Sequence, residues 1–424
     1  MFRPIVALAA LTSIVHAAPT SGKKGFTGKP VVSGYWPSYQ ASLLRPEDIP
    51  YDVYTHIDWF VASTTDSYEL NLDGHEEDLK AVVAKAHTAG ITVSMSIGGW
   101  TGSIYFSDLV ANATAREAYA KSMKSYVDLY NLDGIDIDWE YPSAQGIGCN
   151  KINVETDSDN FLEFVKVLRE TLGPSARISA AVSQFGIKGP TGELYAKFAE
   201  FAKYMDYILP MTYDTYGPWS ATSGPLGPLR DLCATPEGQG ASAEATVKRF
   251  TEAGFPANQI VLGLPSYSRA LVTESSTLTR TAVNGGSSLL YQNITSELAE
   301  GGVTSAPAGV DVCGVQTAAG ASWLFNELIS TGKLNEDATM GMGDWKRYWD
   351  HCSQTPFLFN NVTRNFIPYD DPQSFETKAA FARSNGLAGI MMFDMTGDTR
   401  DSKLIRAARR RIIGKDTRVL CVRR

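Results

Sequence analysis

The chain of 424 residues carries a formal net charge of −8, and 44% of its residues are hydrophobic. These values exclude a largely disordered chain and fit one large barrel or two ordinary domains. They also argue against a nucleic-acid partner, because phosphate binding requires clustered Lys and Arg. After the N-terminal segment no apolar run approaches the roughly 20 residues that a membrane span needs. We therefore expect neither a nucleic acid nor a membrane as partner.

The N-terminal residues are typical of a secretory signal peptide. Arg3 precedes an apolar run over residues 5–11, and residues 15–17 match a small-residue cleavage pattern. A buried N-terminal helix is the alternative, but the segment is short and polar residues follow it. We therefore expect a signal peptide over residues 1–17, an N-terminal extension over 18–30, and a secreted, extracellular, monomeric protein.

Strand and helix patterns alternate along the rest of the chain. Apolar or alternating runs predict eight strands, at residues 31–36, 54–62, 91–97, 134–139, 177–184, 205–212, 259–267 and 387–395. Helical patterns lie between or after them at 75–89, 115–130, 160–171, 194–203, 242–253 and 401–412. The fold class is therefore α/β, and eight parallel strands with crossover helices close most naturally into a TIM (β/α)8 barrel, with its active site where the strands end. A doubly wound open sheet is the alternative.

The barrel is expected to span residues 31–413, with one long interruption. The gap between the seventh and eighth strands is far longer than one crossover needs, and it contains an aromatic cluster of its own. We interpret residues 270–372 as an inserted α+β subdomain that forms one wall of a groove at the C-terminal face. The basic residues of the tail, 414–424, are interpreted as solvated, with no function assigned.

The strongest chemical signal lies on the fourth predicted strand. Asp136, Asp138 and Glu140 share one parity and therefore one face of the strand, while Ile135 and Ile137 take the other face. The three carboxyls should point into the barrel, where like charges at close range cannot all ionise, so their pKa values should spread apart. Such a spread provides an acid catalyst. A solvated acidic edge strand and a divalent metal site are the alternatives at this point.

Five segments resemble motifs of one family. Residues 133–140 match the DxxDxDxE signature of glycoside hydrolase family 18, the chitinases and their relatives. In the family's order, Gly34-Tyr35-Trp36 resembles the first-strand motif and Ser94-Met95-Ser96-Ile97-Gly98-Gly99-Trp100 resembles the SxGGW motif of the third strand. Met211-Thr212-Tyr213-Asp214 resembles MxYD on the sixth strand, and residues 263–269 resemble the seventh-strand motif. The resemblance spans about residues 31–412 and implies a chitinase that hydrolyses β-1,4 bonds between N-acetylglucosamine residues.

The resemblance also implies the catalytic roles. Glu140 acts as general acid and then as general base, and Asp136 shares a proton with Asp138. Family 18 enzymes are retaining and substrate-assisted, so the N-acetyl oxygen of the sugar attacks the anomeric carbon. Asp138 then orients the acetamido N–H and stabilises the positive oxazolinium. Tyr213 donates its hydroxyl to the acetamido group. Neither a metal nor another cofactor is required.

A wider set of residues is implied in substrate binding: Tyr35, Ser96, Gly99, Trp100, Tyr141, Met211, Asp214, Arg269 and Phe393. Met211 and Asp214 shape the acetamido pocket, and Trp100 stacks on a sugar face. Three of these roles have structural alternatives. Tyr35 and Ser96, implied to hydrogen-bond the carboxylate stack, could simply be buried residues that find partners, Trp100 could pack in the core, and Arg269 could form a structural salt bridge.

Two positions depart from the family pattern. The eighth strand usually carries a Trp as the floor of the cleavage subsite, and this chain has Phe393 there, which offers less stacking area. On the second strand the usual aromatic is shifted by one position, which leaves the role of Phe60 undecided, and His56 is interpreted as structural. The resemblance further implies non-proline cis peptides at Glu140-Tyr141 and Phe393-Asp394.

The five cysteines lack CxxC spacing, which argues against zinc and permits disulfides in an exported protein. We predict that Cys313 pairs with Cys352, because both lie in the insertion, and that Cys149 pairs with Cys233, because both follow barrel strands at one end. About fifteen arrangements of two bonds exist, and one cysteine stays unpaired. Asn112, Asn293 and Asn361 begin N-glycosylation sequons.

Two other functions remain open. An endo-N-acetylglucosaminidase acting on N-glycans would share the DxxDxDxE strand, although the complete MxYD motif and the insertion favour chitin or chitooligosaccharides as the ligand. A non-catalytic chitin-binding lectin is the other, and such lectins typically lose the acid, which Glu140 retains. The sequence does not decide between internal and end-directed cleavage, and the insertion favours a deep groove and end-directed action.

Overall fold

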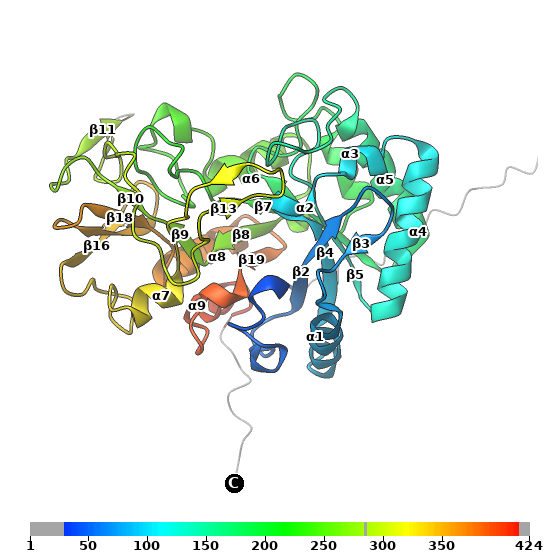
Figure 1. Cartoon of the computed structure of the whole chain (residues 1–424), viewed down its shortest axis with the longest axis horizontal. Coiled ribbons are helices and arrows are strands. Elements are labelled where there is room, and N and C mark those ends of the chain that lie inside the picture. The colour runs from blue at the N-terminus through cyan, green and yellow to red at the C-terminus, as the bar shows by residue number, and fades with distance from the viewer. Residues whose placement is uncertain (1–28, 284–285, 415–424) are drawn as a thin grey trace, which may run out of the picture.

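The computed structural model describes residues 29–283 and 286–414 (Figure 1). The expected signal peptide 1–17, most of the extension 18–30, and the tail beyond Gly414, with Cys421, lie outside the described residues. Within the described ranges no helix is both long enough and apolar enough to cross a bilayer. The three sequon asparagines, Asn112, Asn293 and Asn361, are all exposed.

Eight parallel strands form the barrel that the sequence predicts. They are β1 (Val31–Pro37), β2 (His56–Thr64), β4 (Thr92–Gly98), β5 (Gly134–Asp138), β6 (Arg177–Ser183), β7 (Tyr207–Met211), β8 (Val261–Pro265) and β19 (Gly389–Phe393). Their order in the sheet is β7-β6-β5-β4-β2-β1-β19-β8, and a parallel bridge between Ile208 and Ile260 links the two ends. A short strand, β3 (Leu70–Asn71), pairs antiparallel with the end of β2. The alternative of an open doubly wound sheet is therefore wrong.

Helices cover the outside of the barrel (Figure 1). The longer ones are α1 (Glu76–Thr88), α4 (Ala113–Tyr130), α5 (Asp157–Leu172), α6 (Ala243–Glu252), α8 (Pro372–Ser384) and α9 (Lys403–Ile412), and two short ones are α2 (Gly99–Gly102) and α3 (Phe106–Leu109). The prediction of a helix over residues 194–203 is wrong for its first four residues. Only residues 198–203 are helical, and they form a 3-10 helix. There Leu194 pairs with Lys188 in an antiparallel bridge and the N–H of Tyr195 donates to Ile187, so the segment is held as a hairpin. The connection between β1 and β2 holds two further 3-10 turns.

The core between the barrel and its helices follows from the alternation of side chains along each strand. On β5, Ile135 and Ile137 are fully buried among the helices. Trp139 continues that face and stacks on Phe106, with ring centroids 5.2 Å apart, and it meets Phe161 edge-on at 5.4 Å. This apolar anchoring fixes which face of β5 is turned toward the barrel interior.

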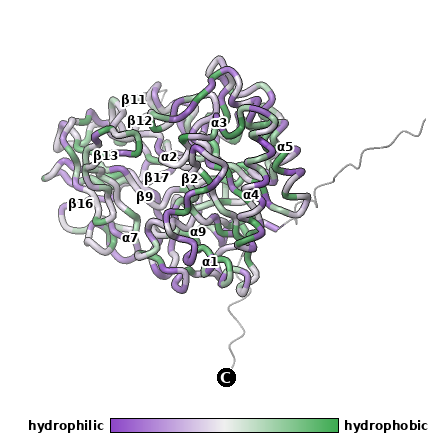
Figure 2. Tube along the Cα trace, turned by 45° about the vertical axis from the view of Figure 1, so that its right-hand side comes forward, coloured by the Kyte–Doolittle hydropathy of each residue, from purple (hydrophilic) through white to green (hydrophobic). Residues whose placement is uncertain are grey.

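An inserted subdomain lies between β8 and β19. Strands β10 (Leu271–Val272), β18 (Asn365–Pro368), β17 (Thr355–Asn360) and β16 (Trp345–Asp350) form an antiparallel sheet in that order. Around it lie α7 (Phe325–Ser330) and three small pairs, β9 (Tyr267–Arg269) with β15 (Ser322–Leu324), β11 (Thr281–Val283) with β12 (Gly286–Ser288), and β13 (Gly309–Val310) with β14 (Gln316–Thr317). Figures 1 and 2 both show β11 and β16 on one side of the molecule, with α4 and α5 on the other.

Two disulfides connect the subdomain to loops of the barrel, and the predicted pairing is wrong. Cys149, which follows β5, is bonded to Cys313, and Cys233, which follows β7, is bonded to Cys352. The prediction paired cysteines by the segment they occupy. Each bond instead joins a barrel loop to the subdomain, an arrangement that depends on how the subdomain docks on the barrel.

Candidate active site

Three carboxylic acids gather at the C-terminal end of β5. Asp136 and Asp138 lie on the strand and Glu140 follows it, and their exposed fractions are 0%, 3% and 8%. Because Ile135 and Ile137 are buried toward the helices, the three acidic side chains take the opposite face, inside the barrel. The stack predicted from the parity of the sequence is therefore present.

Asp136 forms the lowest level of the stack and is held by three hydroxyl groups. Tyr35 Oη and Ser96 Oγ donate to Asp136 Oδ2 over 2.6 and 2.9 Å, as expected from the first-strand and third-strand motifs. Ser179 Oγ on β6 donates to Oδ1 over 2.7 Å. The sequence analysis missed Ser179, although a small polar residue at an inward position of the neighbouring strand was a usable signal.

Burial raises the pKa of all three acids, and nearby negative charges add to the effect. Burial, followed by the charge of Asp58, raises the pKa of Asp136 to about 6 against its hydrogen bonds. The pKa of Asp138 is raised well above its ordinary value by burial and then by Glu140 and Asp136. Burial raises the pKa of Glu140 to about 7, with a contribution from the charge of Asp214 and an opposing hydrogen bond from Tyr141. Near neutral pH the stack therefore retains protons, as an acid catalyst requires.

The backbone around Glu140 is fixed on both sides. The N–H of Glu140 donates to Ser103 Oγ over 3.1 Å, and Ser103 Oγ in turn lies 2.8 Å from the carbonyl oxygen of Asp138. Asn150 Nδ2 donates to the carbonyl oxygen of Glu140 over 3.2 Å. The peptide bond between Glu140 and Tyr141 is cis, as the resemblance implied. Ser103 and Asn150 lie in loops without any marking motif, and the sequence analysis did not single them out.

Aromatic rings form the floor of the site. Phe393, at the end of β19, lies between Tyr35, Phe60, Tyr213 and Tyr267, with ring centroids 5.4 to 6.3 Å away. The expected cis bond between Phe393 and Asp394 is present, and a third cis bond, between Phe60 and Val61, was not expected. Phe60 thus belongs to the floor, which settles the position that the sequence left undecided.

Glycine is required where the chain leaves β4 and meets this floor. Gly99 has a φ of +73°, and a Cβ at this position would lie 2.8 Å from the ring of Phe60 and 3.8 Å from Asp138 Oδ2. The side chain of Trp100, which follows it, is 50% exposed, so the alternative of core packing is wrong. An exposed indole therefore follows directly on Gly99, at the end of β4, the strand paired with β5.

Residues at or just after the ends of β7 and β8 complete the site. Tyr213 is buried, and burial raises the pKa of its phenol well above the ordinary value, so it stays a hydrogen-bond donor. Arg269 donates from Nε and Nη2 to the two carboxylate oxygens of Asp214 over 2.7 and 2.6 Å. The salt bridge considered for Arg269 is therefore present. Met211, at the end of β7, is half-buried.

A buried polar group beneath the stack was not predicted. Asp58 on β2 accepts a hydrogen bond from Ser33 Oγ over 2.5 Å and lies 3.1 Å from His56 Nε2. His56 Nδ1 contacts Thr92 Oγ1 at 2.6 Å, in agreement with a structural role for this histidine. Asp58 is fully buried and its charge contributes to the raised pKa of Asp136.

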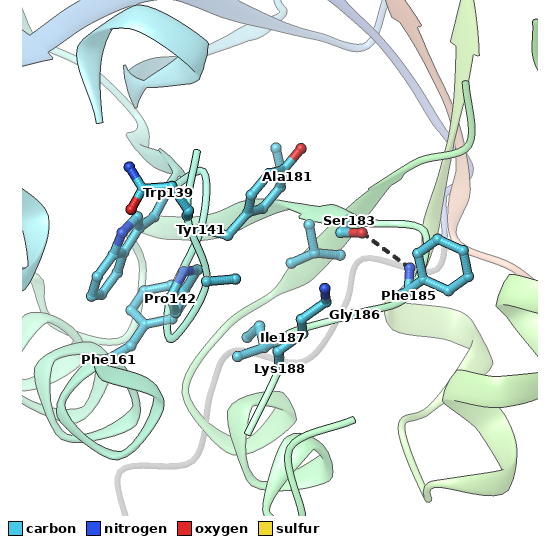
Figure 3. Close-up of a pocket in the computed structure, with 13 residues that line it drawn as sticks. Trp139, Tyr141, Pro142, Phe161, Ala181, Ser183, Phe185, Gly186, Ile187 and Lys188 are labelled. Atoms are coloured by element: carbon cyan, nitrogen blue, oxygen red, sulfur yellow. Dashed lines mark hydrogen bonds between the residues drawn. The ribbon is translucent and has the colours of Figure 1, made fainter. Parts of the chain in front are cut away.

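A cavity of about 170 Å³ lies behind Tyr141 (Figure 3). Tyr141 and Pro142 of the loop after β5 border it on one side, and Ser183 and Phe185 at the end of β6 border it on the other. Trp139 and Phe161, which pack between the barrel and its helices, also line it, whereas Glu140 does not, so the cavity adjoins the loop after β5 without containing the acid.

Comparison with known proteins identifies the family. A family model described as glycosyl hydrolases family 18 matches residues 31–398. The chain belongs to glycosyl hydrolase family 18. The family assignment agrees with the five motifs and with the barrel around the carboxylate stack.

Relatives within family 18 include proteins with different descriptions. A chitinase-like effector of Moniliophthora perniciosa is 35% identical over 90% of this chain and 87% of its own length. A chitinase-like effector of Moniliophthora roreri is 34% identical over 88% of this chain and 91% of its own length. The crystal structure of a chitinase from Rhizomucor miehei superposes with a TM-score of 0.79 and 29% identity, covering 91% of this chain and all of that one.

Proposed function

We propose that this family 18 member is an active chitinase that hydrolyses β-1,4 bonds between N-acetylglucosamine residues with retention of configuration. The observation that carries the proposal is the buried stack of Asp136, Asp138 and Glu140, in which the pKa of Glu140 is raised to about 7. A carboxylic acid that keeps its proton near neutral pH can protonate the glycosidic oxygen and later, as the carboxylate, activate water.

The nucleophile in this proposal is the N-acetyl oxygen of the substrate. Asp214, whose charge acts on Glu140, has both carboxylate oxygens bound by Arg269, which leaves it poorly placed to attack carbon. Asp138 has one buried carboxylate oxygen, Oδ1, without a hydrogen-bond partner among the described residues. That oxygen is suited to accept the acetamido N–H and to stabilise the oxazolinium charge. Tyr213 would donate to the acetamido group from the opposite side.

A second candidate function is sugar binding without turnover. The names of the two Moniliophthora relatives, chitinase-like effector, favour it. Against it stand Glu140, Asp138, Asp136 and Tyr213, all of which are present and buried, and the hydrogen bond that Tyr35 donates to Asp136. An endo-N-acetylglucosaminidase would share the same carboxylates, and release of sugar from a glycoprotein compared with release from chitin oligomers would distinguish it.

Turnover of a chromogenic chitobioside tests the proposal. We expect hydrolysis by the unmodified chain and a loss of several orders of magnitude in Glu140→Gln, because the amide keeps the size of the side chain and lacks the proton. Glu170→Gln, on the exposed face of α5, is the matched control and should retain full rate. Fully deacetylated chitosan and cellulose should not be cut, since both lack the attacking carbonyl oxygen. Equal rates for Glu140→Gln and the unmodified chain would refute the assignment.

Export also belongs to the proposal. The two disulfides support it, because such bonds persist in oxidising compartments outside the cytosol. Intact mass of the protein recovered from the medium of the producing cell tests it, with a first residue near Ala18 as the expected result. The same measurement reads the occupancy of the three sequons.

A further inference from the structure

A hairpin arm leaves the inserted subdomain and is bonded covalently to the barrel. We call residues 301–320 the arm. At its base the N–H of Gly302 donates to Ser322 over 2.8 Å, and the N–H of Gly320 donates to Ala306 over 2.8 Å. Farther out, β13 pairs antiparallel with β14. Cys313 lies in the turn between these two strands and forms the disulfide with Cys149.

The two ends of the arm lie on opposite sides of the candidate active site. At the base, Ser322 of β15 is paired with Arg269 of β9, the residue that binds Asp214. At the tip, Cys149 adjoins Asn150, which donates its hydrogen bond to the backbone of Glu140. The base follows β8, and the tip reaches the loop after β5. These two strands are almost opposite each other in the ring of eight. In Figure 1 the yellow segment that carries β13 extends from the subdomain toward α2.

The arm is long enough to cross the mouth of the barrel. An extended chain from Ala306 to Cys313 covers about 23 Å at about 3.3 Å per residue. Eight strands about 4.8 Å apart and tilted by about 36° enclose a barrel of about 15 Å in diameter. This length exceeds the width of the opening, and the two attachment points follow β8 and β5, which lie three places apart in the ring of strands.

The disulfide, rather than packing, determines where the tip lies. The valines near the tip are largely exposed: Val310, Val312 and Val315 have exposed fractions of 60%, 54% and 57%. The strand pairing comprises two residue pairs, and an isolated two-stranded hairpin is marginally stable in water. Without the bond to Cys149 the tip would lose its attachment to the loop after β5.

We propose that the arm is a fixed roof across the mouth of the active site, so that a chitin chain enters by threading one end beneath it. The inference rests on the proposed function and specifies the form of its substrate, a chain with a free end. A groove open along its whole length accepts the middle of a polymer, whereas a groove crossed by a covalently closed arm excludes it. The exposed valines would face the apolar sides of the sugar rings.

Binding of an end-blocked ligand tests the roof. A long chitooligosaccharide is prepared with a protein cap at both ends, and its uncapped form serves as reference. Both are bound to full-length protein carrying Glu140→Gln, so that no cleavage occurs. We expect association with the capped form to be slower by on the order of tenfold or more than with the uncapped form. In Cys149→Ser combined with Cys313→Ser, the two association rates should become equal.

Two further variants keep the test decisive. Cys233→Ser combined with Cys352→Ser removes the other disulfide, which leaves the arm attached, and should preserve the discrimination. Replacement of residues 308–318 by two glycines, together with Cys149→Ser, removes the roof and should abolish the discrimination even if the serine pair does not fold. Equal association of both ligands with the intact arm would overturn the inference alone. Absence of binding by either ligand would overturn the proposed function, and this inference with it.

Discussion

Glu140→Gln should stabilise the folded protein, and the gain should grow with pH. In the folded chain burial raises the pKa of Glu140 to about 7, against an ordinary value of 4.5. Below pH 4.5 the group is protonated in both the folded and the unfolded state, so its ionisation costs nothing. Above pH 7 it is ionised in both states, and the folded state carries the unfavourable burial of the charge. The favourable contribution of the protonated group is therefore lost as pH rises from about 4.5 to about 7.

The magnitude follows from the difference between the two pKa values. A difference of about 2.5 pKa units corresponds to about 3 kcal/mol of unfolding free energy at 1.36 kcal/mol per unit. Glutamine is neutral at every pH and avoids this loss. The pKa of Asp138 is raised in part by Glu140, so the substitution also lowers the cost of ionising Asp138, with the same sign. For a folded unit of this size 3 kcal/mol corresponds to about 4 °C in Tm.

Thermal unfolding of the unmodified and variant proteins between pH 4 and pH 8.5 measures the effect. The difference in Tm should increase by about 4 °C across this range, with most of the change between pH 4.5 and pH 7. Glu170→Gln, at an exposed position on α5, should show a difference that does not change with pH. A constant difference for Glu140→Gln would refute the raised pKa, and with it the physical basis for its role as an acid.

Three other predictions concern the pH dependence of kcat/KM on a chromogenic chitobioside. The rate should fall tenfold per pH unit above about pH 7, where Glu140 loses its proton, and a flat profile to pH 9 would contradict this. Arg269→Ala leaves the charge of Asp214 uncompensated, so the pKa of Glu140 and the alkaline limb should move to higher pH; a shift downward would show that Arg269 acts by another route. Ser179→Ala removes a hydrogen bond that lowers the pKa of Asp136, so the acidic limb should move upward and kcat should decrease, whereas an unchanged limb would exclude this serine from the network.

The sequence by itself determined the barrel and the centre of the site. The alternation on the fourth strand placed Ile135 and Ile137 outward and the carboxyls inward, because side chains of a strand alternate between its faces. The five motifs then placed Tyr35 and Ser96 beneath the stack. Both sets of positions depend on local periodicity or on short spacing, and both can be read along the chain.

Only the tertiary structure revealed the contacts between segments that are distant in sequence. Ser179 and Asp58 act on Asp136 from other strands, and neither lies in a recognised motif. Their roles follow from strand register in the closed barrel, since a residue's neighbours on adjacent strands are decided by the shear of the sheet. The same closure brings Phe60 into the aromatic floor.

The disulfides show most clearly that contacts between distant segments cannot be predicted from the sequence. The sequence predicted pairs within one segment or at one end of the barrel, and the structure instead joins Cys149 to Cys313 and Cys233 to Cys352. A disulfide forms only where two Cα atoms come within about 7 Å, and that distance depends on how the inserted subdomain docks on the barrel. Sequence fixes which residues lie on one face of an element, because that periodicity is local. The packing of whole elements decides which faces meet and which distant cysteines come within bonding distance.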